Sequence, residues 1–216
     1  EDALEEIDRC LNNNWHNHKA RALKTSILRK MCRIEEALEL AKESLQFDLF
    51  NYGCRYEQYL MTGDETLMEE MKRMLRKSAQ NYDEVALDYV AAGLNDEARD
   101  IWKIAIAENA ASPMTYYYLG CLGISSKGAG SHYFELAEKA DSAYCFPNRA
   151  EDVVALEKAK KYNPNGAKAP YYLGCLYYAA RQYDLAIENW ERSAQLDSSF
   201  PTVWRNLALG RFNKHN

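Results

Sequence analysis

The sequence has few of the residues that build turns and none of the long apolar runs that span membranes. It contains only 10 Gly and 5 Pro in 216 residues, and all-β folds use many such residues in their turns, so an all-β fold is disfavoured. The most apolar stretch, 114–124, is too short for a bilayer, which needs about 20 residues. The chain also opens without an initiator methionine and without the basic and apolar regions of a signal peptide.

An excess of basic residues and a disulfide framework are also missing. The chain carries 27 Lys and Arg against 32 Asp and Glu, a formal charge of −5, and nucleic-acid surfaces normally show a basic excess. The six cysteines include no CxxC pair and are irregularly spaced, which fits reduced thiols better than paired ones. We therefore expect a cytoplasmic protein with neither a nucleic-acid nor a membrane partner.

What the sequence does have is an internal repeat. Residues 116–122 read YYYLGCL, and residues 171–177 read YYLGCLY. A weaker copy follows one 34-residue step later, where Leu207 and Ala208 take the places of Leu173 and Gly174. Repeats of this length indicate a solenoid of stacked helix pairs.

This pattern resembles the tetratricopeptide repeat (TPR), with Leu-Gly and Tyr in a first helix and Ala, an aromatic and a small residue in a second. In 167–200 the matching residues are Leu173, Gly174, Tyr177, Ala186, Trp190 and Ser193. In 79–112 they are Tyr82, Val85, Ala86, Tyr89, Ala98, Trp102 and Ala105. In 18–51 only Thr25, Leu28, Ala37, Ala41 and Ser44 fit.

The resemblance implies an all-α fold: a right-handed α-α superhelix, or TPR-like solenoid, of antiparallel helix pairs forming a single domain over 1–216. The repeats are degenerate in 1–78 and clearer at 79–112, at 113–166 with an extra helix, at 167–200 and, truncated, at 201–216. Apolar spacing and helix breakers predict helices near 2–12, 18–30, 34–46, 49–61, 64–78, 81–92, 95–109, 113–124, 131–143, 149–163, 168–179, 183–197 and 201–213. A loop is expected at 125–130. The sequence leaves open which two of the three helices in 113–166 form the regular pair.

Residue patterns that carry catalysis or bind metals are absent from the sequence. There is no Gly-x-Ser-x-Gly and no His-Glu-x-x-His motif. His16 and His18 are close together but lack the Cys or carboxylate cluster that a zinc site needs. We therefore predict no catalytic residue, no metal site and no cofactor, and hence a protein that is not an enzyme.

The resemblance also implies a partner-binding groove, because first helices build the concave face of such repeats. The residues at these positions are Met114, Tyr117, Cys121, Lys168, Tyr171, Cys175, Tyr178, Arg205, Leu209 and Phe212. This set is aromatic and apolar with one Lys and one Arg, a composition suited to gripping a peptide. The alternative is that another part of a larger protein, or the superhelix itself, covers this face. Cys121 and Cys175 are either groove thiols or small packing residues.

The predicted function is a non-catalytic protein–protein interaction scaffold that binds a partner segment in this groove. Residues 146–149 through 200–208 are also similar to the helical-repeat tail of large bacterial proteins that have an N-terminal domain of unknown function. That resemblance implies the alternative function, a module that positions or caps an upstream domain, for which a carbohydrate-active one is a candidate. Trp204, Leu207 and Phe212 would leave apolar surface at the C-terminal end, which predicts a further helix or homo-oligomerisation there.

Overall fold

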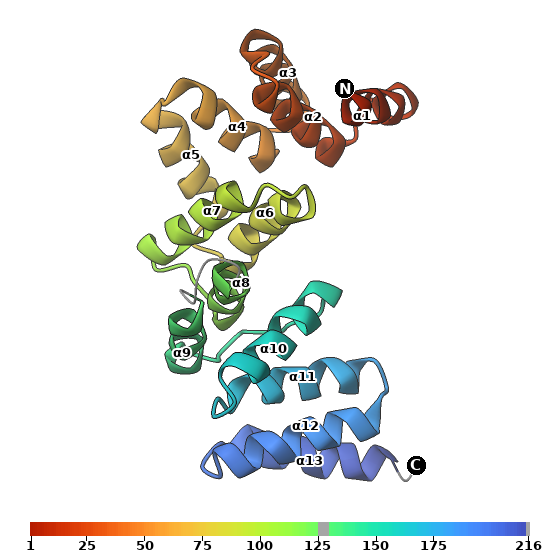
Figure 1. Cartoon of the computed structure of the whole chain (residues 1–216), viewed down its shortest axis with the longest axis vertical. Helices are drawn as coiled ribbons and strands as arrows, with labels where there is room; N and C mark the ends of the chain where they lie inside the picture. The colour runs from red at the N-terminus through yellow and green to blue at the C-terminus, as the bar shows by residue number, and fades with distance from the viewer. Residues whose placement is uncertain (125–129, 215–216) are drawn as a thin grey trace. The chain divides into compact units, whose positions relative to one another are not determined.

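The computed structural model describes residues 1–124 and 130–214, and within these residues every regular element is an α-helix (Figure 1). The helices are α1 (Asp2–Asn13), α2 (His18–Lys30), α3 (Ile34–Phe47), α4 (Tyr52–Thr62), α5 (Glu65–Leu75), α6 (Ala79–Ala91), α7 (Asn95–Ala107), α8 (Pro113–Ile124), α9 (Ser131–Lys139), α10 (Ala150–Tyr162), α11 (Lys168–Ala179), α12 (Tyr183–Leu196) and α13 (Pro201–Lys214). Each predicted helix is confirmed. Residues 125–129 of the predicted loop lie outside the described residues.

The largest error in the predicted boundaries is at the end of α9. The apolar spacing predicts a helix to 143, but α9 ends at Lys139 because Ala140 adopts an extended conformation with φ −65° and ψ 150°. The irregular segment that follows contains Tyr144 with φ +58°, a left-handed conformation that non-glycine residues rarely adopt. Periodicity alone did not reveal this early stop.

The chain divides into two compact units, Glu1–Asn109 and Ala110–Asn216. The single domain over 1–216 therefore remains a prediction. Within the described residues, no helix is long and apolar enough to cross a membrane.

The N-terminal unit consists of α1 followed by the pairs α2–α3, α4–α5 and α6–α7. Three of these helices have a polar N-cap residue. Asn17, Asn51 and Asp64 each accept a hydrogen bond from a backbone N–H in the first turn. Gly63 ends α4 with φ +66°, the left-handed conformation that glycine adopts at little cost. Each short turn returns the chain beside the helix that it has just left, so the paired helices are antiparallel.

The C-terminal unit contains the pairs α8–α9 and α11–α12, together with α10 and α13. In each pair a first-helix glycine allows close approach of a large side chain from the second helix. A Cβ on Gly120 would lie less than 3.0 Å from the Phe134 ring, and one on Gly174 less than 3.0 Å from the Trp190 ring. Close packing of a large side chain on a glycine gives these two pairs a TPR-like arrangement.

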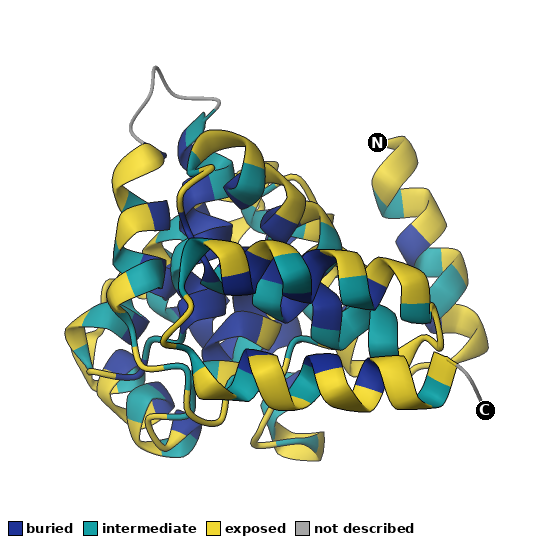
Figure 2. Cartoon of the chain, turned by 90° about the horizontal axis from the view of Figure 1, so that it is seen from below, coloured by how far each residue is buried: buried dark blue, intermediate teal, exposed yellow. Residues whose placement is uncertain are grey.

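The packing at Gly120 also settles the pairing within 113–166. Because Phe134 lies on α9, the regular pair is α8–α9, and α10 is the extra helix, which packs against both α8 and α11. The burial pattern follows the same scheme, with dark-blue buried residues on the facing sides of the helices and yellow exposed ones outside (Figure 2).

Candidate functional site

A pocket of about 390 Å³ lies in the N-terminal unit, between the first helices of its three pairs. Its walls come from α2, from α4 with the turn before it, and from α6 with the turn after it. The lining residues are His18, Lys19, Ala22, Leu23, Ser26, Asp48, Phe50, Asn51, Tyr52, Gly53, Asn81, Glu84, Val85, Asp88, Tyr89, Ala91, Ala92 and Leu94. The volume falls within the range of small-ligand pockets, about 300–1,000 Å³.

Part of the pocket wall forms where α2 and α4 approach each other closely. A Cβ on Gly53 would lie 2.7 Å from the Cβ of Ala22, so only glycine allows this separation of the two helices. Glycine inside a helix costs about 1 kcal/mol relative to alanine. The close packing of α2 on α4 offsets that cost.

The rim of the pocket combines apolar and charged groups. Leu23 is 38% exposed and Phe50 is 57% exposed, although both are large and apolar. Across the rim, Lys19 on α2 pairs with Asp88 on α6 at 2.6 Å, and His18 lies 3.4 Å from Asp48. The accessible part is thus an apolar surface bordered by groups of both charges.

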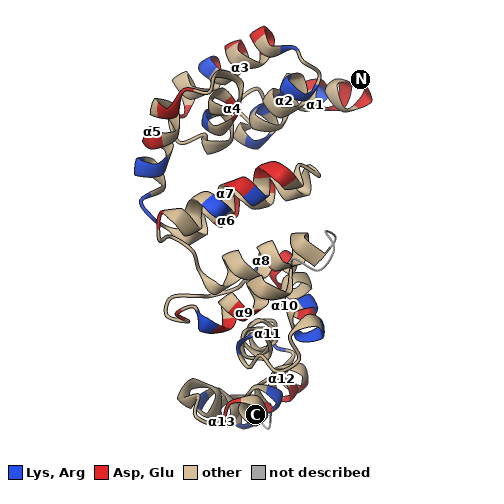
Figure 3. Ribbon diagram, turned by 60° about the vertical axis from the view of Figure 1, so that its left-hand side comes forward, with Lys and Arg blue, Asp and Glu red and all other residues tan. Residues whose placement is uncertain are grey.

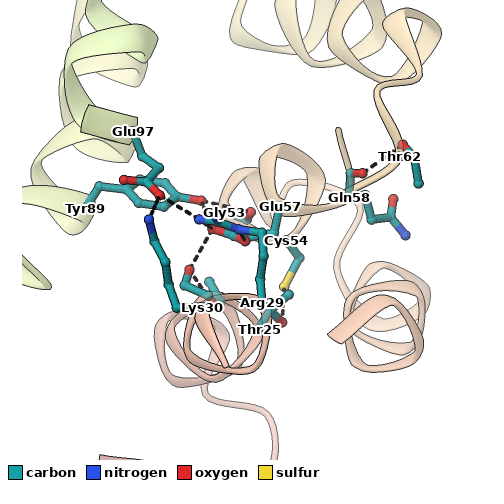
Figure 4. Close-up of polar contacts among 12 residues, drawn as sticks. Thr25, Arg29, Lys30, Gly53, Cys54, Glu57, Gln58, Thr62, Tyr89 and Glu97 are labelled. Atoms are coloured by element: carbon teal, nitrogen blue, oxygen red, sulfur yellow. Dashed lines mark hydrogen bonds and ion pairs between the residues drawn. The ribbon is translucent and has the colours of Figure 1, made fainter. Parts of the chain in front are cut away.

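A buried polar network holds α6 and α7 against α2 and α4 beside this pocket (Figure 4). Its centre is the carboxylate of Glu57, which is fully buried. Glu57 accepts hydrogen bonds from the Ser26 hydroxyl at 2.8 Å, from the Tyr89 hydroxyl at 2.9 Å and from the Arg29 guanidinium. Arg29 also donates to Glu97 at 2.8 Å. Since Ser26 and Tyr89 also line the pocket, the network forms part of its wall.

The network changes the acid–base behaviour of its members. Burial alone would raise the pKa of Glu97, but hydrogen bonds from Lys30 and Arg29 outweigh burial and lower that pKa to about 2. Burial opposes the charge of Arg29, yet its hydrogen bonds to Glu57 and Glu97 raise the Arg29 pKa above its usual value. Burial, with the nearby charge of Glu57, raises the pKa of Tyr89 well above its ordinary value. Near pH 7 Glu97 and Arg29 therefore stay charged and Tyr89 stays neutral.

The pocket offers no recognisable catalytic arrangement. Among the described residues, no group of three or more His, Cys, Asp or Glu side chains could hold a metal ion. The ionised groups next to the pocket pair with one another, as Lys19 does with Asp88. What the arrangement provides chemically is a concave apolar surface with polar edges.

The structure separates the groove residues predicted from the sequence into two groups. Met114 and Tyr117 lie in the interior, 5% and 0% exposed, and the Tyr117 hydroxyl donates to Glu138 at 3.0 Å. They therefore present no surface to a partner. Cys121 is half-buried, and its Sγ lies 3.6 Å from the Ala155 carbonyl oxygen of α10. The extra helix α10 thus covers part of the expected face of α8.

The remaining predicted residues gather around α11 and α13. Tyr171, Cys175 and Tyr178 are half-buried against the cluster formed by α12 and α13. Lys168 is also half-buried, and its ammonium donates to the Ala140 carbonyl. On α13, the exposed groove residues are Arg205, Leu209 and Phe212. Burial raises the pKa of Tyr171 to about 12 and that of Cys121 to about 11, so both remain neutral near pH 7.

The sequence did not reveal the N-terminal pocket, because the repeats that form it are degenerate. The Leu-Gly pair that marks first helices at 119–120 and 173–174 has no counterpart in α2, α4 or α6. Gly53 was the available signal, since a glycine inside a predicted helix suggests a close helix contact. The charged network gave no comparable signal, because Arg29 and Glu97 are distant in the sequence.

Comparisons with known proteins assign no family to the chain. No protein-family model matches the chain. The chain is similar to YrrB, described as a TPR protein with an unusual peptide-binding site, with 15% identity over 99% of this chain and 86% of YrrB and a TM-score of 0.31. It is similar to MamA with 18% identity, 88% and 84% coverage and a TM-score of 0.32.

Yeast Tom70 is a further similar structure, with 17% identity, 98% coverage of this chain, 42% coverage of Tom70 and a TM-score of 0.38. These scores are too low to carry an argument about this chain. The TPR-like description therefore rests on the glycine–aromatic contacts of the helix pairs, such as that of Gly174 with Trp190.

Proposed function

We propose that this chain is a protein-interaction scaffold without catalytic activity, and that its N-terminal pocket receives an apolar side chain of a partner peptide. The observation that carries the proposal is the pocket of about 390 Å³ bounded by α2, α4 and α6. Its volume suits one or two large side chains, and its rim exposes Leu23 and Phe50. Large apolar anchors that fill such pockets provide most of the binding energy of peptide complexes.

The charged rim favours a partner that brings polar groups on either side of its anchor. Lys19 and Asp88 are 75% and 51% exposed, respectively. Because they are exposed and paired, they are expected to influence orientation and association rate more than affinity. The peptide backbone would provide hydrogen-bonding groups at the same positions.

The test begins with selection of binding peptides from a random displayed library, followed by fluorescence anisotropy with one labelled peptide. A Leu23→Asp/Phe50→Asp variant places charge in the pocket without altering buried positions. The matched control, Leu185→Asp/Phe146→Asp, makes the same changes at exposed residues of the C-terminal unit. We expect the first variant to weaken binding at least tenfold, about 1.4 kcal/mol, and the control to bind as wild type.

Equal binding by the pocket variant and wild type would refute the pocket as the site. Failure to select any peptide would count against the scaffold function itself. Circular dichroism and thermal unfolding of both variants would confirm that the fold is retained.

A second candidate surface combines the exposed part of α13 with the half-buried tyrosines of α11. Its support is that Tyr171, Cys175 and Tyr178 come together beside Arg205, which is near enough to influence the pKa of Tyr171. An Arg205→Ala/Leu209→Ala variant tested with the same peptide separates the two candidates. Loss of binding in this variant but not in the pocket variant would move the site to the C-terminal unit.

A further inference from the structure

A second depression lies beside the pocket of the N-terminal unit, against α5, and is here termed the α5 depression. It has a volume of about 410 Å³ and is lined by Phe50, Glu70, Arg73, Met74 and Arg76. Phe50 is exposed and also lines the pocket between α2, α4 and α6. A peptide that leaves the pocket over Phe50 therefore enters the α5 depression.

The wall between the pocket and the α5 depression forms where α4 meets α5. Tyr52 lines the pocket, and its hydroxyl donates to the Met74 carbonyl oxygen at 3.3 Å. Met74 in turn lines the depression. Burial raises the pKa of Tyr52, and the nearby charge of Arg76 opposes that shift. Phe50 and Tyr52 thus separate the apolar pocket from the guanidinium groups of the depression.

The two arginines of the α5 depression have no acidic partner of their own. Glu70 pairs with Arg55 of α4 at 3.3 Å. Within residues 1–124 and 130–214, neither Arg73 nor Arg76 forms an ion pair or a side-chain hydrogen bond, and both are exposed. Figure 3 shows the end of α5 and the turn that follows it in blue. Since Arg55 already balances Glu70, the depression has an uncompensated positive charge.

The α6 side of the pocket carries the opposite charge. Glu84 and Asp88 of α6 line the pocket there, and Asp88 pairs with Lys19. A carboxylate of a partner is therefore repelled from the α6 wall and attracted to the α5 depression. Such a difference in sign selects one orientation of a charged partner.

We propose that the partner is an acidic peptide, in which an apolar anchor fills the pocket and a neighbouring Asp or Glu binds Arg73 and Arg76. This inference rests on the proposed peptide-binding function and adds the chemistry of the partner. A guanidinium can donate two parallel hydrogen bonds to one carboxylate. Because an extended chain advances about 3.3–3.6 Å per residue, the acidic residue is expected roughly two to four residues from the anchor.

A peptide fits these charges better than an anionic membrane surface does. A membrane presents negative charge over a broad area, so it would meet Glu84 and Asp88 of the pocket as well as the two arginines. A peptide brings a single acidic group to the α5 depression and an uncharged anchor to the pocket. The pocket itself, which a flat surface would leave empty, also favours a peptide.

Selection from a random displayed peptide library on three forms of the chain tests the composition of the partner. Wild type is expected to enrich Asp and Glu within about four residues of an apolar anchor. Arg73→Gln/Arg76→Gln is expected to keep the anchor and to lose the acidic enrichment. Lys158→Gln/Lys161→Gln is the matched control, because it removes two exposed charges with the same spacing on α10, and it is expected to select as wild type. Circular dichroism verifies that both variants are helical.

Fluorescence anisotropy with one selected peptide measures the charge contact directly. Replacing the Asp and Glu of the peptide by Asn and Gln is expected to weaken wild-type binding roughly 3–10-fold, since exposed charge pairs contribute modestly. The same replacement should have little effect with Arg73→Gln/Arg76→Gln, because the partner charges are already absent. Salt should weaken the wild-type complex of the acidic peptide more than that of its neutral form.

The outcomes separate this inference from the pocket function on which it rests. Leu23 lines the pocket but not the α5 depression, so Leu23→Asp should weaken binding of the acidic and the neutral peptide alike. If it does so while wild type selects no acidic residues, or while neutralising the peptide has equal effects on wild type and the arginine variant, the acidic partner is refuted and the pocket function stands. Unchanged binding by Leu23→Asp, or no selected peptide, would overturn both.

A lipid surface is the remaining occupant to test. Wild type and Arg73→Gln/Arg76→Gln are sedimented with vesicles of equal parts phosphatidylcholine and phosphatidylserine, and neither is expected to bind. Binding of wild type alone, together with no acidic enrichment among its peptides, would overturn the proposal and assign the two arginines to lipid headgroups.

Discussion

The first helices of the helix pairs differ sharply in charge between the N-terminal and the C-terminal unit. In the N-terminal unit, α2 carries Lys19, Arg21, Lys24, Arg29 and Lys30. In the C-terminal unit, α8 has no charged residue and appears wholly tan in Figure 3, and α11 has only Lys168. The N-terminal helices are joined by buried ion pairs and hydrogen bonds, whereas the C-terminal pairs are joined mainly by aromatic rings packed on glycines.

The comparison shows that neighbouring helices can be held together by two kinds of chemistry, ionic between the pairs of the N-terminal unit and aromatic within the pairs of the C-terminal unit. Aromatic-on-glycine packing is tight and insensitive to pH, and it fills the space between helices. The ionic network around Glu57 depends on charge, and a pocket remains beside it. The N-terminal unit is therefore expected to respond to pH and to have room for a ligand.

The largest expected effect tests the buried network. Glu57→Ala removes the acceptor of Ser26, Arg29 and Tyr89, and is expected to lower the free energy of unfolding by about 3–5 kcal/mol, because Arg29 is left without its fully buried counter-charge. Urea unfolding followed by circular dichroism measures this change. Glu70→Ala is the control, since Glu70 is 49% exposed in its pair with Arg55, and its expected cost is below about 1 kcal/mol. Equal costs would abolish the distinction between buried and exposed pairs.

The next effect concerns the aromatic packing of the C-terminal unit. Gly174→Ala forces a methyl group against the Trp190 ring and is expected to destabilise the chain by roughly 1–3 kcal/mol. Trp190→Phe in the same chain makes space, so the double variant should lose less stability than the sum of the two single variants. Strictly additive losses, measured by urea unfolding, would show that the two residues do not press on each other.

The pH dependence of Glu97 sharpens the comparison further. Its folded-state pKa of about 2 lies below the ordinary value of 4.5. A depressed pKa stabilises the fold above about pH 4.5, and this stabilisation is lost as the pH falls from about 4.5 to 2. Glu97→Gln should therefore cost roughly 1–3 kcal/mol at pH 7 and much less near pH 2. A cost independent of pH would contradict the depressed pKa.

Native-state hydrogen exchange provides a local measure of the same effect. Acidification from pH 7 to about pH 3 is expected to reduce the protection factors of α6 and α7 in wild type, after correction for the intrinsic exchange rate. Helices α11 and α12 should change less, because Trp190 and Gly174 carry no titrating group. An equal loss of protection in both pairs would remove the predicted difference between the units.

The smallest effect is expected at the rim of the pocket. Lys19→Ala breaks an exposed ion pair with Asp88 and should change the free energy of unfolding by about 0.2–1 kcal/mol. The same measurement in high salt should show a smaller difference, because salt screens exposed charges. A cost above about 2 kcal/mol would mean that this pair contributes like the buried network.

Much of the fold could be predicted from the sequence, because helix formation depends on local features. Apolar spacing, capping residues such as Asn51 and Asp64, and breakers such as Gly63 act within a few residues of one another. The repeat pattern also predicted that Gly174 and Trp190 lie in the two adjacent helices of one repeat. The candidate site was less predictable, because Met114 and Tyr117 occupy expected groove positions but are buried.

The sequence by itself determined the all-helical architecture and the approximate position of each helix. Only the tertiary structure decided that α9 pairs with α8, that α10 covers part of the α8 face, and that the pocket lies between α2, α4 and α6. The physical reason is the distance along the chain over which each effect acts. Periodicity shows which face of a helix is apolar, whereas the partner of that face depends on residues far apart in the chain, as Arg29 and Glu97 illustrate.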